Sequence, residues 1–386
     1  MQKHICNIYI FLWCLYSLQG TLYSRGSIIS QLLLVIIIMI SFYYFFILLT
    51  HHKLPDVLKV LSWLLLLWTI YGFIIIIYGN GVKALPNHYY LKNIYVAQLP
   101  VYVFYYFSKE GYLTESLLRK WAVVFLIIGI ARFNTHYDEN LANAIERGSS
   151  KEEFTNNKAY VILAIMPFIP LYFKKPIIQY ILLGVCMLYV LLGMKRGAIL
   201  SGAICSVWFL FKSFKENSYS GTKVWKGLLT IIIIAGAVFA IQWMLLTSAY
   251  FVQRLDLTLE GNSSGRDRIY LNYFNYFVNQ SNYFHLLLGN GADATFRILH
   301  QYAHDDWLEI AINNGLFMVF LYAIYWIIML RTIGKVKKVN YTYFLILGMY
   351  FIIYFMKTIY SMSYYSIPFV ASCAFGFALA NSINTE

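Results

Sequence analysis

Apolar residues form long, nearly unbroken stretches along the chain, and short polar segments between them carry most of the charge. A helix needs about 20 mostly apolar residues to cross the hydrocarbon core of a bilayer. The pattern predicts a helix in each of twelve stretches, at about 5–19, 28–50, 57–78, 93–107, 117–131, 158–173, 177–193, 197–211, 226–248, 307–330, 341–359 and 363–380. Gln98 and Pro100 interrupt the fourth stretch. The first resembles the apolar part of a signal peptide, but no small-residue cleavage site follows it, so we interpret it as a helix.

The composition supports a membrane protein. Of the 386 residues, 60% are hydrophobic and 12% are charged, whereas soluble domains have about half apolar and about a quarter charged residues. A soluble enzyme, a disordered chain and a disulfide-rich secreted domain are therefore excluded. The five cysteines lie inside apolar stretches without metal-ligand spacing, and we expect buried, unreactive thiols. The predicted fold class is an all-α polytopic membrane protein with about twelve transmembrane helices.

The net charge of +13 is explained by its placement along the chain. With a cytoplasmic N-terminus, the loops and termini on that side carry 16 basic and five acidic residues, and the short loops on the other side carry five basic ones. Short cytoplasmic loops are enriched in Lys and Arg. Both termini are therefore predicted to be cytoplasmic, and the basic excess requires no nucleic-acid partner.

Two long connections fall on the outer side, at 132–157 and 249–306. They divide the chain into helices one to nine (1–248), the large loop (249–306) and helices ten to twelve (307–386). Loops of this length usually carry function or are disordered. The larger one is rich in motifs rather than low in complexity, so we expect the functional chemistry there.

An aromatic run opens the second half of the large loop. Tyr270, Tyr273, Phe274 and Phe277 recur at helical spacing. Two interpretations fit, namely an amphipathic helix lying in the outer interface and a helix packed on the membrane core. The Gly-Asn-Gly sequence at 289–291 indicates a turn, because glycine tolerates positive φ, and it lacks the context of a dinucleotide-binding loop.

His304 is the candidate general base. It precedes two acids at the start of a predicted helix, where Asp305 or Asp306 can cap exposed N–H groups. A nearby carboxylate would orient the imidazole and raise its basicity. The alternative is an ordinary histidine at the membrane interface.

Basic residues near the outer surface form the second candidate group. Arg196, Arg266 and Arg268, with Lys195 and Lys357, are expected to form a cationic cluster. Guanidinium groups bind phosphate oxygens with two parallel hydrogen bonds, so a polyanionic lipid head group is the expected ligand. The alternative is a set of surface arginines. No metal site is predicted, because there is no His-x-x-x-His and the acids form no ligand set.

Several short motifs resemble those of the O-antigen polymerase and O-antigen ligase superfamily of bacterial glycosyltransferases. They are Met-Lys-Arg-Gly-Ala at 194–198, Ser-Gly-Arg at 264–266, Gly-Asn-Gly at 289–291, His-Asp-Asp-Trp-Leu-Glu at 304–309 and Asn-Gly-Leu at 314–316. The third group resembles the family signature His-Asn-x-x-Leu-Glu followed by Gly-Leu, with Asp in place of Asn. The likeness covers the whole architecture, although the motifs span only part of it.

This resemblance implies a C-type glycosyltransferase fold in the bacterial inner membrane, with a periplasmic site beneath the large loop. It also implies a glycan donor on undecaprenyl diphosphate, metal-independent transfer and no cofactor. His304, Arg266 and Arg196 would be catalytic. The residues expected to contact substrate are Lys195, Arg268, Asp305, Tyr270 and Lys357.

The function predicted from the resemblance is a repeat-unit polymerase for O-antigen or capsular polysaccharide, with a chain-length regulator (co-polymerase) as a possible partner. One alternative is an O-antigen ligase that transfers the same donor to lipid A-core. A second alternative is a flippase of lipid-linked oligosaccharide.

Overall fold

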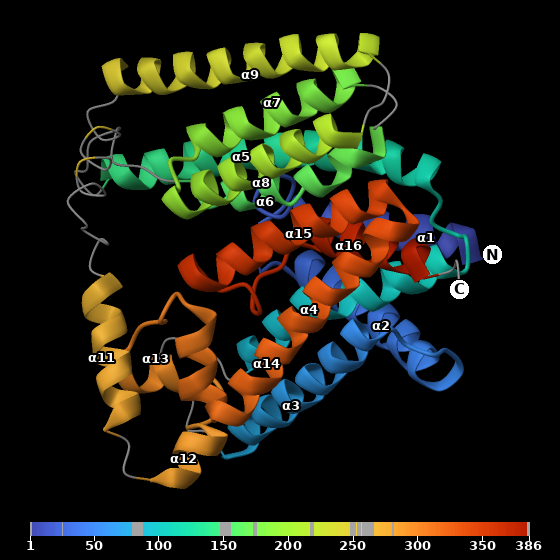
Figure 1. The fold of residues 1–386 in the computed structure, drawn as a ribbon. Coiled ribbons are helices and arrows are strands. Elements are labelled where there is room, and N and C mark those ends of the chain that lie inside the picture. Colours follow the sequence, from blue (N-terminus) through green and yellow to red (C-terminus); the bar gives the residue numbers. More distant parts are fainter. Residues whose placement is uncertain are drawn as a thin grey trace.

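The computed structural model describes residues 2–24, 26–78, 88–146, 156–172, 176–216, 220–247, 252, 256, 266–279 and 282–383 (Figure 1). Its helices are α1 (Gln2–Ser17), α2 (Ile28–His51), α3 (Asp56–Tyr78), α4 (His88–Lys109), α5 (Glu115–Glu146), α6 (Ala159–Leu163), the 3-10 helix η1 (Met166–Tyr172), α7 (Pro176–Leu192), α8 (Arg196–Glu216), α9 (Ser220–Thr247), α11 (Arg266–Val278), α12 (Tyr283–Leu288), α13 (Ala294–Leu299), α14 (Asp306–Val339), α15 (Tyr341–Tyr360) and α16 (Phe369–Ile383).

The protein is all-α, as predicted. Helices account for 84% of the structure, and the described residues contain no strand. Four helices, α2, α3, α14 and α15, are long and apolar enough to cross a membrane. Their outward faces are apolar, and residues such as Leu32, Trp63 and Phe320 are each more than half exposed. Such faces would be unfavourable in water and are suited to lipid.

Each of the twelve predicted stretches overlaps helical structure, with three main differences. The twelfth, predicted from 363, becomes helical only at Phe369, directly after Pro368. The sixth stretch is a short α-helix, α6, followed by the 3-10 helix η1, because Pro167 and Pro170 lack the N–H groups that an α-helix needs. In addition, α5 continues to Glu146, so the first part of the predicted loop 132–157 is helical. Residues 147–155 lie outside the described part.

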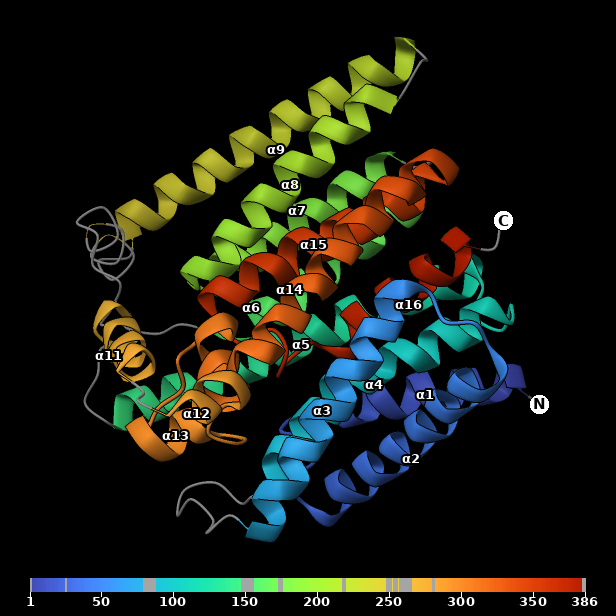
Figure 2. The same cartoon turned by 60° about the horizontal axis from the view of Figure 1, so that its bottom comes forward.

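The centre of the bundle is the pair α4 and α16, which pack along each other (Figure 2). A Cβ atom on Gly376 would lie 2.8 Å from the backbone of Tyr105, so this glycine permits the close approach. The polar residue Gln98, which interrupts the fourth stretch, is buried and donates from Nε2 to the carbonyl oxygen of Tyr364 at 2.6 Å. This hydrogen bond joins α4 to the connection 361–368 between α15 and α16.

The start of α1 and the end of α16 lie at one end of the bundle, and α11, α12 and α13 lie at the opposite end (Figures 1 and 2). The helices of the large loop are thus far from both termini.

The predicted aromatic helix is present as α11, and its residues divide between two faces. Tyr273 is fully buried, and Phe277 packs against the same small core. Phe274 is exposed, together with Leu271 and Val278. The helix is therefore packed on the protein along one face and also presents an apolar face outward, which combines features of the two interpretations.

The Gly-Asn-Gly segment at 289–291 forms the predicted turn and docks onto a break in α14. Gly315 has a φ of 78°, which interrupts that helix. The N–H of Gly291 donates to the carbonyl oxygen of Asn313 at 2.9 Å. A Cβ atom on Gly289 would lie 2.4 Å from that oxygen. Glycine is therefore required by close backbone approach, and this motif fixes the loop to α14.

Candidate functional site

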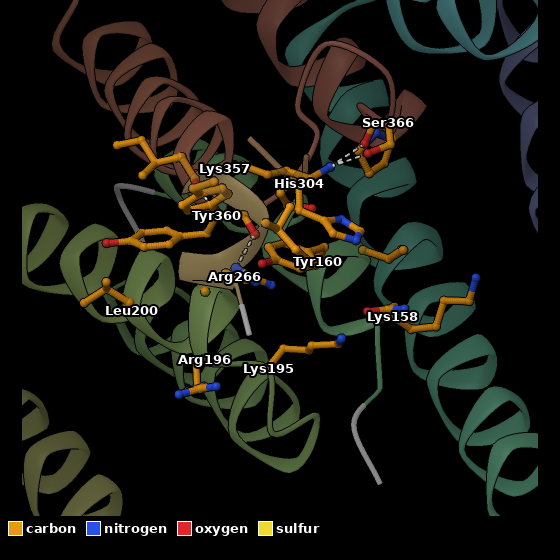
Figure 3. Close-up of a pocket in the computed structure, with 18 of the residues that line it drawn as sticks. Lys158, Tyr160, Lys195, Arg196, Leu200, Arg266, His304, Lys357, Tyr360 and Ser366 are labelled. Carbon is orange, nitrogen blue, oxygen red and sulfur yellow. Dashed lines mark hydrogen bonds between the residues drawn. The ribbon is translucent and has the colours of Figure 1, made fainter. Parts of the chain in front are cut away.

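A pocket with a volume of about 1010 Å³ lies where α6, α8, α11, α15 and the segment before α14 meet (Figure 3). It brings together six of the eight residues selected from the sequence, Lys195, Arg196, Arg266, Tyr270, His304 and Lys357. Among the described residues that line it, five are Lys or Arg and one, Asp267, is acidic. We refer to it as the cationic pocket.

The turn between α7 and α8 supplies Lys195 and Arg196. Met194 has a φ of 49°, and this left-handed residue reverses the chain so that both cations stand at the N-terminus of α8. A Cβ atom on Gly197 would lie 2.6 Å from the Tyr160 hydroxyl. Packing therefore explains why glycine follows Arg196, because a side chain at position 197 would displace Tyr160 from the pocket wall.

Arg266 is the first residue of α11 and joins that helix to the end of α15. Its Nη1 donates to the carbonyl oxygen of Tyr360 at 2.9 Å (Figure 3). One turn further along α11, the Tyr270 hydroxyl donates to the carbonyl oxygen of Ile359 at 3.3 Å. The exposed carbonyls at the C-terminus of α15 thus hold a cation at the pocket wall, with the rest of its guanidinium available to the pocket.

Lys357 reaches the pocket from within α15, although it is only 4% exposed. Its Nζ donates to the carbonyl oxygen of Ser366 at 2.6 Å and to the Ser366 hydroxyl at 2.8 Å. The same ammonium lies 5.5 Å from the centre of the Tyr160 ring. Fixed acceptors and a ring face therefore hold this charge in place, because a buried cation needs partners.

His304 stands at the pocket with a φ of 56°, directly before the N-cap of α14. Burial, and then the charges of Arg266 and Lys195, lower the pKa of its imidazole from the ordinary 6.5. The expectation that a neighbouring carboxylate raises the basicity of His304 is wrong, because burial and then the two cations lower the pKa of its imidazole. The lowered pKa keeps the imidazole neutral near pH 7, as a general base requires.

The two acids after His304 have separate structural roles. Asp305 is the N-cap of α14, and its carboxylate accepts from the N–H of Leu308 at 2.9 Å, which confirms the predicted capping. Asp306 is fully buried and accepts from the N–H groups of Ser363 and Tyr364 at 2.8 and 3.1 Å. It therefore fixes the connection 361–368, which forms another part of the pocket wall.

Two selected residues do not line the pocket. Arg268 is exposed on α11, and the carboxylate of Asp305 caps the N-terminus of α14. Their predicted contacts with substrate remain predictions. Ser264 and Gly265 of the Ser-Gly-Arg motif lie outside the described residues.

The lining residues that were not selected from the sequence include Lys158, Tyr160 and Tyr360. Lys158 and Tyr160 lie at the start of the sixth stretch, and Tyr360 ends α15. Each of these three residues lies near the end of a predicted helix, and this position could have identified them as candidates from the sequence. Their convergence on α8 and α11 depends on packing between distant segments and has no local pattern.

The described residues include no group of three or more His, Cys, Asp or Glu side chains that could hold a metal ion. The five cysteines are buried, as predicted. Cations and helix N-termini together make the pocket suited to an anion, because both present positive charge toward it.

Models of known protein families and curated protein sequences were both compared with the chain, and neither comparison finds a match.

Proposed function

We propose that this protein is a glycosyltransferase that polymerises oligosaccharide repeat units carried on undecaprenyl diphosphate. The single observation that carries the proposal is the cationic pocket, in which Lys195, Arg196, Arg266 and Lys357 surround a cavity that His304 also lines. Fixed cations stabilise a departing diphosphate, and a neutral imidazole accepts a proton. A volume of about 1010 Å³ is sufficient for a sugar diphosphate.

In the proposed reaction, a hydroxyl oxygen of the acceptor sugar attacks the anomeric carbon of the donor glycan. The new glycosidic C–O bond forms while the bond between the anomeric carbon and the diphosphate oxygen breaks. The hydroxyl proton passes to the neutral imidazole of His304. Undecaprenyl diphosphate leaves with the bonding electron pair, and Arg266 and Arg196 stabilise its negative charge.

The proposed topology has twelve transmembrane helices, both termini in the cytoplasm and the cationic pocket facing the periplasm of the bacterial inner membrane. Two observations support it. The termini and the loop helices α11–α13 lie at opposite ends of the bundle (Figure 1). The basic residues of the short loops are concentrated on the side of the termini. The apolar outer face of α11 would contact the outer leaflet.

The placement of charge favours an enzyme over a flippase. A carrier that moves a lipid diphosphate across the membrane requires cationic contacts along a path with access to both sides. The cationic side chains that line the pocket come from the start of α8, the start of α11 and the last turn of α15, with Lys158 just before α6. A one-sided anion site is suited to a reaction whose substrates and product share one face.

Polymerase and ligase reactions use the same donor and leaving group, and they differ in the acceptor. The motif composition of the loop supports the polymerase, and a co-polymerase remains its proposed partner. Deletion of the gene in the host distinguishes the two. Loss of a polymerase leaves single repeat units attached to lipid A-core, whereas loss of a ligase leaves lipid A-core without any attached repeat unit. The second outcome would contradict the proposal, and complementation with His304→Ala should not restore chain extension.

A further inference from the structure

A second group of polar side chains includes close chain neighbours of His304 and Ser366, which line the cationic pocket. We refer to it as the tyrosine cluster. Its members come from α4, α14, the start of α13 and two connections: Tyr90, Asp293, Tyr302, Asn314, Tyr364 and Tyr365. None of them is among the residues that line the cationic pocket.

The tyrosine rings surround a single carboxylate. Tyr365 is central, with ring-centre distances of 6.0 Å to Tyr90, 6.2 Å to Tyr302 and 5.7 Å to Tyr364. All four rings lie within electrostatic reach of the Asp293 carboxylate. The cluster thus combines aromatic surfaces with one acid in a small volume.

Several buried polar atoms of this cluster make no well-formed hydrogen bond within the described residues. They are the hydroxyls of Tyr90, Tyr364 and Tyr365 and both amide atoms of Asn314, although the side chains of Asn93 and Tyr302 lie near the Tyr365 hydroxyl. Asn314 faces the Tyr90 hydroxyl but not with hydrogen-bond geometry. Buried polar groups are almost always paired, because leaving them unpaired is unfavourable. Several of them in one place indicate a site built for a ligand.

Asp293 is held in position for that ligand. It is 5% exposed, its φ of 51° places it in the left-handed region, and its side chain does not cap α13. A non-glycine residue in this region is strained and frequently functional. Arg297 offsets the charge of Asp293, so the cluster is close to neutral. Burial raises the pKa of Asp293 to about 6.

Glu309 is a second buried acid near the cluster, but its carboxylate is already hydrogen-bonded within the protein and is not available to a ligand. Its carboxylate accepts from the Thr295 hydroxyl, from the N–H of Ala303 and from Nδ2 of Asn313. One available carboxylate beside tyrosine hydroxyls and an amide is a poor cation site. Ring faces, neutral donors and acceptors, and one carboxylate suit a neutral polyhydroxylated ligand.

From this arrangement we infer that the tyrosine cluster is a binding subsite for an uncharged sugar of the acceptor glycan, adjacent to His304. Tyr302 and Tyr365 are only partly buried, so a ligand would reach the cluster at these two residues. Tyr302 is two residues before His304, and Tyr365 is next to Ser366 of the cationic pocket. A glycan held there lies beside the base, while the donor diphosphate occupies the cationic pocket. The acceptor role rests on the proposed function, whereas the binding of a neutral sugar does not.

Two binding measurements on the full chain in lipid nanodiscs test this inference. Saturation-transfer NMR measures binding of neutral oligosaccharides of glucose, galactose, mannose, N-acetylglucosamine, N-acetylgalactosamine and rhamnose at millimolar concentrations. A separate titration measures binding of undecaprenyl diphosphate. We expect the wild type to bind at least one of the oligosaccharides and also the lipid diphosphate.

Tyr365→Phe and Tyr90→Phe should each weaken oligosaccharide binding about tenfold, since each removes a buried hydroxyl that makes no well-formed hydrogen bond within the protein. They should leave the unfolding temperature unchanged or raise it, and they should leave diphosphate binding unchanged. Tyr9→Phe on α1 is the matched control. It loses a hydrogen bond to Ser41 at 2.8 Å, so it should unfold earlier but bind oligosaccharide normally.

The outcomes separate the two proposals. Wild-type protein that binds lipid diphosphate but none of the oligosaccharides overturns the subsite, and so does normal oligosaccharide binding by both cluster variants. Wild-type protein that binds an oligosaccharide through the cluster but not lipid diphosphate supports the subsite and contradicts the proposed function.

Discussion

Glu309 accepts a hydrogen bond from the backbone N–H of Ala303 at 2.7 Å, and Ala303 directly precedes His304. The same carboxylate accepts from Nδ2 of Asn313 at 3.2 Å, one turn along α14. A fully buried acid thus fixes the strained backbone of the candidate base to the start of a long helix. Glu309 is a positioning residue, because it acts on His304 through the chain.

Glu309→Gln should therefore reduce catalysis more than binding. The amide has one acceptor oxygen and leaves a buried donor unpaired, which lowers the free energy of unfolding by about 1–3 kcal/mol. We expect kcat to fall about tenfold with a smaller change in KM. Kinetics and thermal unfolding of the purified variant measure both effects.

Glu115→Gln is the matched control, because Glu115 forms an exposed pair with Arg119 on α5. Such pairs contribute little to stability. If Glu309→Gln raised KM and left kcat unchanged, the positioning role would be wrong.

The pH dependence of kcat/KM should have an acidic limb set by His304. Burial and the charges of Arg266 and Lys195 lower its pKa below 6.5. A base works in its neutral form, so activity should be present above that pKa and be lost as the pH falls through it. Lys195→Gln removes one cation and should move the limb to higher pH. A limb that stays in place or moves to lower pH would show that another group is titrating.

Arg266→Lys and Arg196→Lys should each lower kcat/KM by at least about tenfold, since an ammonium cannot make two parallel hydrogen bonds to a phosphate. Arg331→Lys provides the control, because Arg331 is exposed on α14, far along the helix from the pocket. The variants are compared by steady-state kinetics with the lipid-linked donor. Activity near the wild-type level in Arg266→Lys would argue against bidentate recognition.

Gly289→Ala should destabilise the connection between the loop and α14. The added Cβ would lie 2.4 Å from the Asn313 carbonyl oxygen, and the φ of 78° is unfavourable for alanine. Strain of this kind lowers the free energy of unfolding by about 1–3 kcal/mol. Gly184→Ala in α7 meets no atom within 4 Å and should be neutral or slightly stabilising. The thermal unfolding midpoints of both variants are measured in the same detergent. Equal midpoints would contradict the predicted destabilisation by Gly289→Ala.

Much of the fold and part of the site follow from the sequence. Apolar stretch length predicts the helices, because the backbone in lipid must satisfy its own hydrogen bonds. Arg196 and Arg266 are identifiable because each stands at the start of a helix, and His304 because it lies just before one. The contact between Gly289 and the break in α14 at Gly315 cannot be predicted from the local sequence, since it forms between two segments that are separated in the chain.

Residues of the tyrosine cluster are also hidden in the sequence. Tyr90, Tyr364 and Tyr365 lie in segments that read as ordinary apolar helix ends. Their importance depends on Asp293, which is distant in the chain. Likewise, the sequence shows that two acids follow His304, but only the folded arrangement shows that burial, and then the charges of Arg266 and Lys195, lower its pKa.

The most direct test of the central claim is polymerisation by the purified protein in nanodiscs. A defined repeat unit on undecaprenyl diphosphate is supplied with and without chelator, and the glycans are sized. The account predicts a ladder of glycans longer than one repeat unit in both conditions, release of undecaprenyl diphosphate, and neither product with His304→Ala. A ladder of equal yield from His304→Ala, or bound substrate that is never extended by the wild type, would contradict it.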